Sequence, residues 1–439
     1  MTERLNDDCI DTYAHDALEL AKKLFPLNRS INSPGTLQTL KELQVSVPQM
    51  KIKQFEAGNK VLDWNIPKRW EVRKASIKRL NGETVLDLND SNLHVIAHSI
   101  PIKAKVKFID LKESIYTLIE KPDAIPYRTS FYKEAWGFCM EHSKFLLMHD
   151  DEYLVEIDSI FTNQPMPYGE IFVPGLNEEK EVLFSTYICH PSMANNELSG
   201  PVTAITLAKY LLSLGEKPNL SYRFLFMPET IGAIAYISSN ITALRENVVC
   251  GLVLTCVGDE NNFSIVKNKN NRNYLEEVMI DECKKLATKY NSPLKIYDFS
   301  VRQSDERQYC SPGVDLPISC FCRSKYGSYP EYHTSDDNFN VVTKKGLAGS
   351  IEALINCVKL LEKARFPKHV FLCEPNLGKR GLYPLMGAKK ISLRVKNIKD
   401  FLAYADGLTT LEKIADQLNL NVAKANSLCD LLIEKGIIK

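Results

Sequence analysis

The stretch EVLFSTYICHPSMANNELSGPVTAITLAKYLLSLG, at residues 181–215, introduces the pattern that the C-terminal half of this chain repeats. It opens with EVLFSTYIC (181–189), an apolar run of strand length, and closes with PVTAITLAKYLLSLG (201–215), which has helical spacing and a final glycine. The polar segment HPSMANNELSG (190–200) connects the two. We therefore predict a buried strand, a loop and a covering helix.

The same alternation recurs further along the chain. Strand-like runs follow at SYRFLFMP (221–228), CGLVLTCVG (250–258) and DLPISCFC (315–322), and amphipathic helices are predicted at 271–290 and 344–364. Buried strands that alternate with helices predict an α/β fold with a mixed, mostly parallel sheet sandwiched by helices. In such sheets the ligand site forms at the carboxyl ends of the strands.

A segment with a different residue pattern lies between two parts of this α/β unit. Short alternating runs such as VRKASIKRL (72–80) and an Asn-Gly pair at 81–82 are typical of β-hairpins. We predict an inserted, mostly β domain at 59–164. The α/β domain then consists of residues 1–58 and 165–370.

The C-terminal segment, 371–439, is predicted to be a linker and a winged-helix domain. A short helix at 398–406 precedes a capping box formed by Thr409 and Glu412, and a third helix and a terminal apolar strand follow. Residues 394–439 carry seven basic and six acidic side chains, a poor electrostatic footprint for DNA. We therefore expect a docking module, with a DNA-binding regulator as the weaker alternative.

Composition excludes several classes of protein. The 439 residues are 44% hydrophobic and 25% charged, as in folded globular proteins, and 55 Lys plus Arg against 54 Asp plus Glu leave a net charge of +1. This balance gives no overall field toward nucleic acid or an anionic membrane. The longest apolar run, 205–214, is interrupted by Lys209, and the first residues lack a secretory signal pattern. We expect a cytoplasmic protein with no membrane partner.

Polar side chains with catalytic potential follow the predicted strands. His190 comes directly after the first strand, Glu229 follows the second, Asp259 follows the third, and His333 lies in YPEYHTSDDN (329–338). Imidazoles and carboxylates from several strands are the ligands of a divalent ion, and an uncoordinated Glu nearby can take a proton from water. The pattern predicts a metal-assisted hydrolase.

These markers, in this order, resemble the zinc aminopeptidase superfamily, whose members remove an N-terminal residue with two co-catalytic zinc ions. The resemblance covers about residues 170–365. It rests on His190, the turn Leu198-Ser199-Gly200, the E-x-x-G motif from Glu229 to Gly232, and Tyr332-His333-Thr334-Ser335 followed by Asp337.

The whole chain is similar to an uncharacterised branch of that superfamily, which has an inserted β domain and a C-terminal winged helix. The stretches PYRTSFYKEAWGFC (126–139) and CEPNLGKRGLYP (373–384) carry this likeness. Members of the branch are at times associated with polysaccharide or secondary-metabolite gene clusters. The resemblance therefore implies a role in polysaccharide biosynthesis or a similar pathway.

The chain departs from the two-zinc pattern at three carboxylates. Asn196 stands where the bridging Asp is expected, Thr230 where an acid follows the general base, and Thr255 where an Asp ends the next strand. Neutral side chains do not offset the charge of two divalent ions. We expect at most one tightly bound ion, zinc or another divalent metal.

The resemblance and the spacing together give a set of candidate site residues. His190, His333 and Glu197 are the predicted metal ligands, although Glu197 could equally cap the following helix, and Glu229 is the predicted general base. Three further residues could complete the metal shell: Asn196, Asp259 and Asp305. Three others could line a substrate pocket and grip a carboxylate or phosphate, with a salt-bridged loop as the equal alternative: Arg302, Arg307 and Tyr309.

The leading hypothesis is hydrolysis of an amide bond near a free amine, in a small-molecule or short peptide-like substrate. One alternative is a catalytically impaired binding protein on the same fold. Another is acyl transfer or cyclisation, which a related core performs with a single metal. The sequence also leaves two assemblies possible: a homo-oligomer, or a complex with a protein partner bound through the C-terminal domain.

Overall fold

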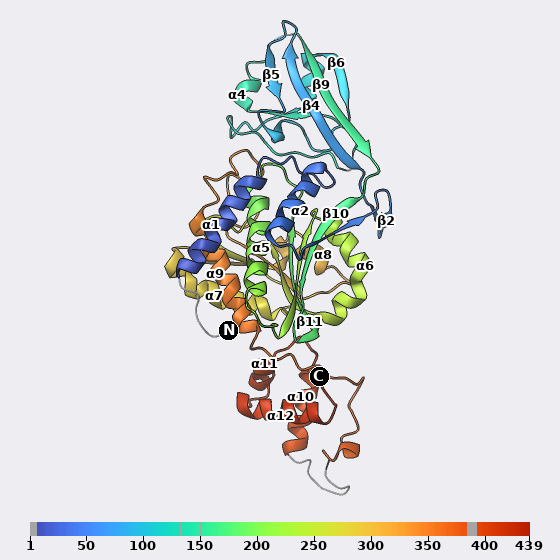
Figure 1. The fold of residues 1–439 in the computed structure, drawn as a ribbon, viewed down its shortest axis with the longest axis vertical. Helices are drawn as coiled ribbons and strands as arrows, with labels where there is room; N and C mark the ends of the chain where they lie inside the picture. The colour runs from blue at the N-terminus through green and yellow to red at the C-terminus, as the bar shows by residue number, and fades with distance from the viewer. Residues whose placement is uncertain (1–6, 132, 150, 384–392) are drawn as a thin grey trace.

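The computed structural model describes residues 7–131, 133–149, 151–383 and 393–439. Its centre is an eight-stranded sheet with the strand order β1-β10-β12-β11-β13-β16-β14-β15 (Figure 1). Strand β11 runs parallel to β12 and β13, β13 to β16, and β14 to β15, which confirms the mixed, mostly parallel sheet. The bounds are β1 Lys51–Phe55, β10 Met166–Val173, β11 Asn177–Tyr187, β12 Leu220–Met227, β13 Val248–Leu254, β14 Phe263–Val266, β15 Leu294–Tyr297 and β16 Ile318–Cys322.

Helices bury both faces of this sheet. Alternate residues of β11 point to opposite faces, so that Phe184 packs with one helix layer and Leu183 with α6 on the other. Because both faces are covered, the strand reads as one continuous apolar run. The first layer contains α1 Asp7–Leu24, α2 Pro34–Ser46, α5 Ser199–Leu212, α7 Tyr274–Tyr290 and α9 Lys344–Leu361, and α6 spans Ile231–Asn247.

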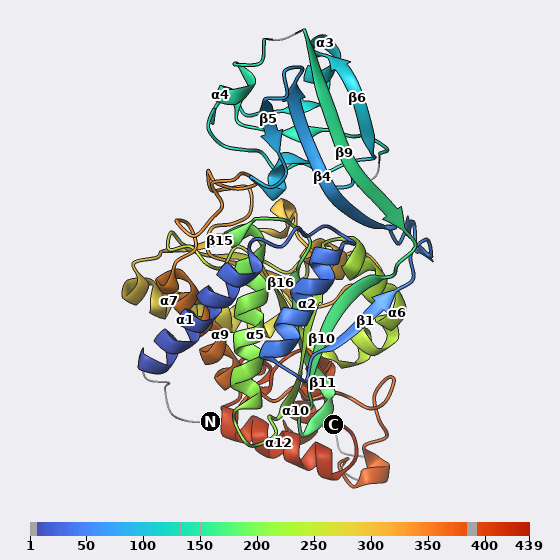
Figure 2. The same ribbon diagram turned by 45° about the horizontal axis from the view of Figure 1, so that its top comes forward.

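The chain leaves the large sheet after β1 and returns to it at β10, which pairs antiparallel with β1. In Figure 2 most of the residues between them, from β4 to β9, form a separate unit above the large sheet. Its antiparallel sheet has the order β5-β4-β9-β6 and a core of its own around Trp70, Phe138 and Tyr153. The bounds are β4 Arg69–Arg79, β5 Thr84–Asp87, β6 Ile102–Lys107 and β9 Glu152–Thr162.

Three short helices form the C-terminal domain, at the opposite end of the molecule from the insert (Figure 1). They are α10 Leu393–Tyr404, α11 Leu411–Gln417 and α12 Val422–Glu434. The predicted cap is wrong by one residue, because Thr410 accepts the hydrogen bond from the Lys413 N–H while Thr409 bonds Asp406. Instead of the predicted terminal strand, the structure has a single antiparallel β-bridge, which joins His369 and Ile438.

Residues 1–6 of the predicted α/β domain, Tyr132 and Asp150 of the predicted insert, and residues 384–392 of the predicted C-terminal domain lie outside the described residues. Within the described ranges, no helix is both long enough and apolar enough to cross a membrane.

Candidate active site

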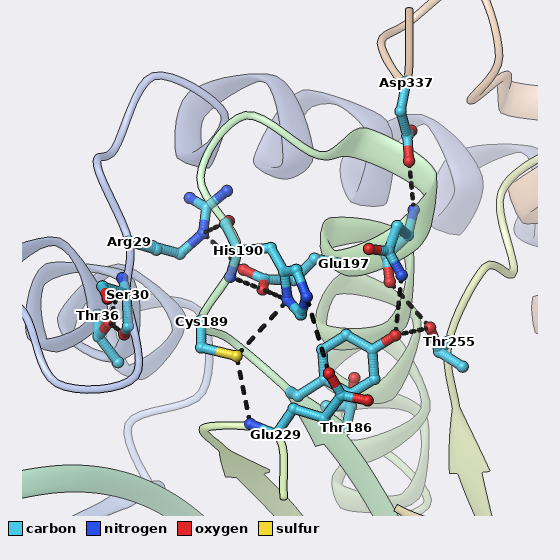
Figure 3. Close-up of polar contacts among 12 residues, drawn as sticks. Arg29, Ser30, Thr36, Thr186, Cys189, His190, Glu197, Glu229, Thr255 and Asp337 are labelled. Carbon is cyan, nitrogen blue, oxygen red and sulfur yellow. Dashed lines mark hydrogen bonds and ion pairs between the residues drawn. The ribbon is translucent and has the colours of Figure 1, made fainter. Parts of the chain in front are cut away.

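Two strand ends and one loop bring the predicted site residues together. His190 follows the end of β11 and Glu229 follows the end of β12, while His333 comes from the loop after β16. The centroids of the two imidazole rings lie 5.6 Å apart. Glu229 Oε2 lies 3.7 Å from His190 Nε2 (Figure 3). Residues nearly 150 positions apart thus converge at one edge of the sheet.

His190 is held in a fixed orientation by Glu197. The His190 Nδ1–H donates to Glu197 Oε2 over 2.9 Å, and the His190 backbone N–H donates to the same oxygen. Although burial alone lowers the pKa of His190, the hydrogen bond and charge of Glu197 raise it above its usual value. Because Nδ1 is engaged, Nε2 is the ring nitrogen that faces Glu229.

Arg29 completes this arrangement from the N-terminal part of the chain. Its Nε lies 2.6 Å from Glu197 Oε1 and donates to the His190 carbonyl over 2.9 Å. The side chains of Arg29 and Glu197 are fully buried. Glu197 therefore lies behind the imidazole, on the side away from Glu229, where it orients the ring.

The donor atoms of Cys189, His190 and Glu197 all lie within 4.8 Å of one another, close enough to hold an ion. The chemistry of this group opposes that use. Glu197 is already bonded to Arg29 and to His190, and burial raises the pKa of the Cys189 thiol well above its usual value. A protonated thiol is a poor metal ligand. This group therefore supports the imidazole rather than forming a site of its own.

The Nε2 atom of His333 is buried and has no hydrogen-bond partner among the described residues. Burial lowers the pKa of His333 to about 3, and the charges of His190 and Arg128 act in the same direction. The ring is therefore neutral at physiological pH. A neutral, unpartnered imidazole beside a second imidazole is a suitable donor for a divalent ion.

Neutral side chains stand at the three positions where the two-zinc pattern has carboxylates, and their hydrogen bonds give no indication of a second ion. The Asn196 amide donates to the Tyr187 hydroxyl over 3.0 Å, and this hydroxyl lies 2.5 Å from Thr255 Oγ1. Thr255 in turn donates to the Asn196 carbonyl over 2.8 Å. Thr230 Oγ1 accepts a bond from Arg307 over 2.6 Å. These bonds tie Thr230, Thr255 and the Asn196 amide nitrogen to the protein frame, whereas Asn196 Oδ1 is buried and has no hydrogen-bond partner among the described residues.

Asp305 and Arg307 lie beside the Glu229 turn. Asp305 Oδ1 accepts the Thr230 N–H over 2.8 Å, and its other oxygen is buried and unpartnered. Burial and then the charge of Glu229 raise the pKa of Asp305 well above its usual value. Burial likewise raises the pKa of Glu229, whereas His190 and Arg307 act to lower it.

The remaining candidates lie elsewhere. Asp259 accepts bonds from the Asn195 amide and from Ser324. Tyr309 is buried and donates to Ser185 over 3.0 Å, and Arg302 is exposed with its guanidinium over the ring of Phe299. These three side chains are engaged in local contacts of their own.

The backbone is strained at four positions in the loops that carry or adjoin the site residues. Ser192, Thr230, Cys256 and His333 all have positive φ, with values of 46°, 64°, 52° and 57°. This conformation is unfavourable for any residue with a Cβ atom, and most of all for a β-branched residue such as Thr230. Such strain tends to gather at functional sites.

Besides Arg29, two contributors to the site had no role assigned from the sequence. Tyr127, from the insert, packs its ring 5.0 Å from His190 and 5.1 Å from His333. Asp337 accepts the backbone N–H groups of Asn195 and Asn196 over 2.6 and 2.9 Å, which fixes the turn before α5. Tyr127 lies in the stretch 126–139 quoted above, and Asp337 was noted as a marker of the superfamily.

Comparison with known proteins agrees with this architecture. A protein from Clostridium acetobutylicum, provisionally named as a polysaccharide biosynthesis protein with aminopeptidase-like domain, is 39% identical over 373 residues, 84% of this chain and 83% of the relative. A crystal structure of a provisionally assigned peptidase from Clostridium acetobutylicum matches with a TM-score of 0.77 and 34% identity, covering 99% of this chain and 98% of that one.

A more distant structure identifies the fold of the core. BSAP, a zinc aminopeptidase from Bacillus subtilis, matches with a TM-score of 0.58 and 14% identity over 81% of this chain and 96% of that one. The core therefore has the zinc aminopeptidase fold. Residues 365–439 match a winged helix-turn-helix family. Residues 18–364 match the family described as "Domain of unknown function (DUF4910)", and the chain belongs to that family.

Proposed function

We propose that this chain is a single-metal hydrolase that cleaves an amide bond next to a free amine in a small or short peptide-like substrate. The observation that carries the proposal is the meeting of the His190 and His333 rings, 5.6 Å apart, with Glu229 beside His190. Two imidazoles would supply two of the three protein ligands that a catalytic zinc site takes, for one divalent ion, zinc in the first place. His190 Nε2 is left free by Glu197, and His333 Nε2 is unpartnered.

A bound divalent ion would polarise the carbonyl of the substrate amide. Glu229, whose side chain is 24% exposed, takes the proton of the attacking water and passes it to the leaving amine. Tyr127 covers the two imidazoles and limits the length of substrate on that side.

The proposal is tested by hydrolysis of aminoacyl amides after loading with zinc. We expect Glu229→Gln to lower kcat by at least about 100-fold, because the amide cannot accept the proton, while bound zinc stays unchanged. Glu331→Gln, on the loop that carries His333, is the matched control and should keep full activity. Equal rates for Glu229→Gln and the wild type would remove the assigned base.

A second candidate is a binding protein on the same fold. The bonded network of Asn196, Tyr187 and Thr255 favours it, because neutral groups occupy positions where a dinuclear site needs carboxylates. Metal analysis separates the two functions. Less than about a tenth of an equivalent of divalent ion, after purification in its presence, would favour binding alone, since structural and catalytic zinc sites bind tightly.

The name of the Clostridium acetobutylicum relative supports a role in polysaccharide biosynthesis. We propose that the reaction takes place in the cytoplasm. The substrate would then be an amine-bearing precursor or an aminoacylated intermediate.

A further inference from the structure

A cavity of about 350 Å³ lies where the winged helix meets the α/β core. It is at the start of β11, so it lies at the opposite end of this strand from His190. In Figure 1 this junction is at the end of the core that faces away from the insert. The cavity is therefore separate from the candidate active site.

The cavity is lined by four cationic side chains and one acid. The cations come from the core, the linker and the last residue of the winged helix: Lys180, Lys363, Arg365 and Lys439. The acid, Glu362, accepts bonds from the Tyr222 hydroxyl over 2.6 Å and from the Leu220 N–H over 3.3 Å. These two donors hold the Glu362 carboxylate against the core.

Lys180 is the central group. Its partly buried ammonium donates to the carbonyl oxygen of Phe366, and within the described chain no carboxylate forms an ion pair with it. Burial, together with the positive charges of Lys368, Lys439 and Arg365, lowers the pKa of Lys180 to about 8. A buried cation that faces other cations lacks a counter-charge.

Two of the other cations are already paired. Arg365 lies 2.8 Å from Asp430, and Lys439 forms an ion pair with Glu179. Lys363 makes no ion pair with a described residue. Lys180 and Lys363 are thus the two lining cations that form no ion pair with a described residue, and a dianion could bond both of them at once.

Apart from Asn177 and Asn219, the rest of the wall is apolar, and it is shared between the domains. The core and the linker supply Leu176, Leu220, Phe366 and Pro367, and α12 supplies Cys429 and Ile433. The volume is in the range of about 300–1,000 Å³ that small-molecule sites occupy. We propose that this cavity binds a small organic phosphate, with its phosphoryl group at Lys180 and its organic part against the apolar wall.

The test is isothermal titration of the full chain in phosphate-free buffer. Glycerol 3-phosphate is the probe, inorganic phosphate tests the anion alone, and glycerol tests the organic part alone. We expect saturable binding of both phosphates, tighter for glycerol 3-phosphate, and none for glycerol. Lys180→Met should weaken binding about tenfold or more, because one charge-assisted hydrogen bond is lost.

Two further variants make the result decisive. Lys439→Gln removes a cation from the winged-helix side and should also weaken binding, whereas Lys284→Met, on the exposed face of α7, should leave it unchanged. Circular dichroism checks that each variant is folded. Absence of saturable heat, or an unchanged Kd in Lys180→Met, would overturn the site. Equal affinity for both phosphates would overturn the role given to the apolar wall.

Discussion

At the scale of single residues, the orientation of His190 depends on a charge pair that water does not reach. Glu197 binds the imidazole Nδ1–H on one oxygen and Arg29 on the other. Carboxylates that hold a histidine through its second nitrogen fix the ring and its tautomer. Removing one partner of a buried pair leaves the other charge without compensation.

We predict that Arg29→Met lowers the free energy of unfolding of the core by about 3–5 kcal/mol, because Glu197 would remain as a buried, unpaired carboxylate. Urea unfolding followed by far-ultraviolet circular dichroism, which reports on the helices of the core, measures the change. Lys23→Met is the matched control, since Lys23 pairs with Glu42 at the surface, with 61% of its side chain exposed, and should cost at most about 1 kcal/mol. Equal losses for the two variants would contradict the role of Arg29.

The sequence could predict some of these residues and not others. His190 and Glu229 directly follow apolar runs, and the carboxyl ends of neighbouring parallel strands meet at one edge, so their proximity followed from the pattern. Arg29 lies 168 residues before Glu197 and has no local signal, because a single sequence does not show which distant side chains pair. For the same reason, the placement of Glu197 behind the ring was not predictable.

At the scale of elements, the insert is attached to the loop that carries His333. The Tyr127 N–H donates to the His333 carbonyl over 2.8 Å, and the Ser335 N–H donates to the Ile125 carbonyl over 2.8 Å. The Ile125 N–H donates to Ser335 Oγ over 2.9 Å, and Lys121 lies 3.0 Å from Asp336. These contacts hold Tyr127 against both imidazoles.

Ser335→Ala removes the acceptor of the Ile125 N–H. We expect amide exchange at residues 124–128 to become about 3–10-fold faster, since a hydrogen bond of this kind contributes about 0.5–1.5 kcal/mol. Hydrogen–deuterium exchange with mass spectrometry measures it. Ser328→Ala, in the same loop but bonded only to Lys325, is the control and should leave residues 124–128 unchanged. Unchanged exchange in Ser335→Ala would show that this bond does not hold the insert.

The strands and helices of the core were predictable because their apolar runs are buried on both faces. The run 181–189 corresponds to β11, and the helix predicted at 344–364 to α9. The contact between the insert and the His333 loop was not predictable, because it consists mainly of backbone hydrogen bonds, which leave no residue pattern. The position of the winged helix on the core depends likewise on long-range contacts.

At the scale of the whole molecule, the third helix of the winged helix packs against the segment that follows α9 and joins this domain to the core. Asn426 and Asp430 of α12 bond Arg365, and Cys429 and Ile433 line the junction cavity. These four positions follow the i, i+3, i+4, i+7 spacing of one helix face. In helix-turn-helix proteins the recognition helix lies in the major groove. Here one face of the corresponding helix is already occupied.

We therefore predict that the full chain binds random-sequence duplex DNA no more tightly than about 10 µM at 150 mM salt, within the range of weak non-specific binding. The occupied face of α12 and the balance of seven basic and six acidic residues at 394–439 are the reasons. A gel-shift series at several salt concentrations measures it, with Lys424→Gln, at an exposed position of α12, as the comparison. A submicromolar shift that weakens steeply with salt and is reduced in Lys424→Gln would show that α12 binds DNA.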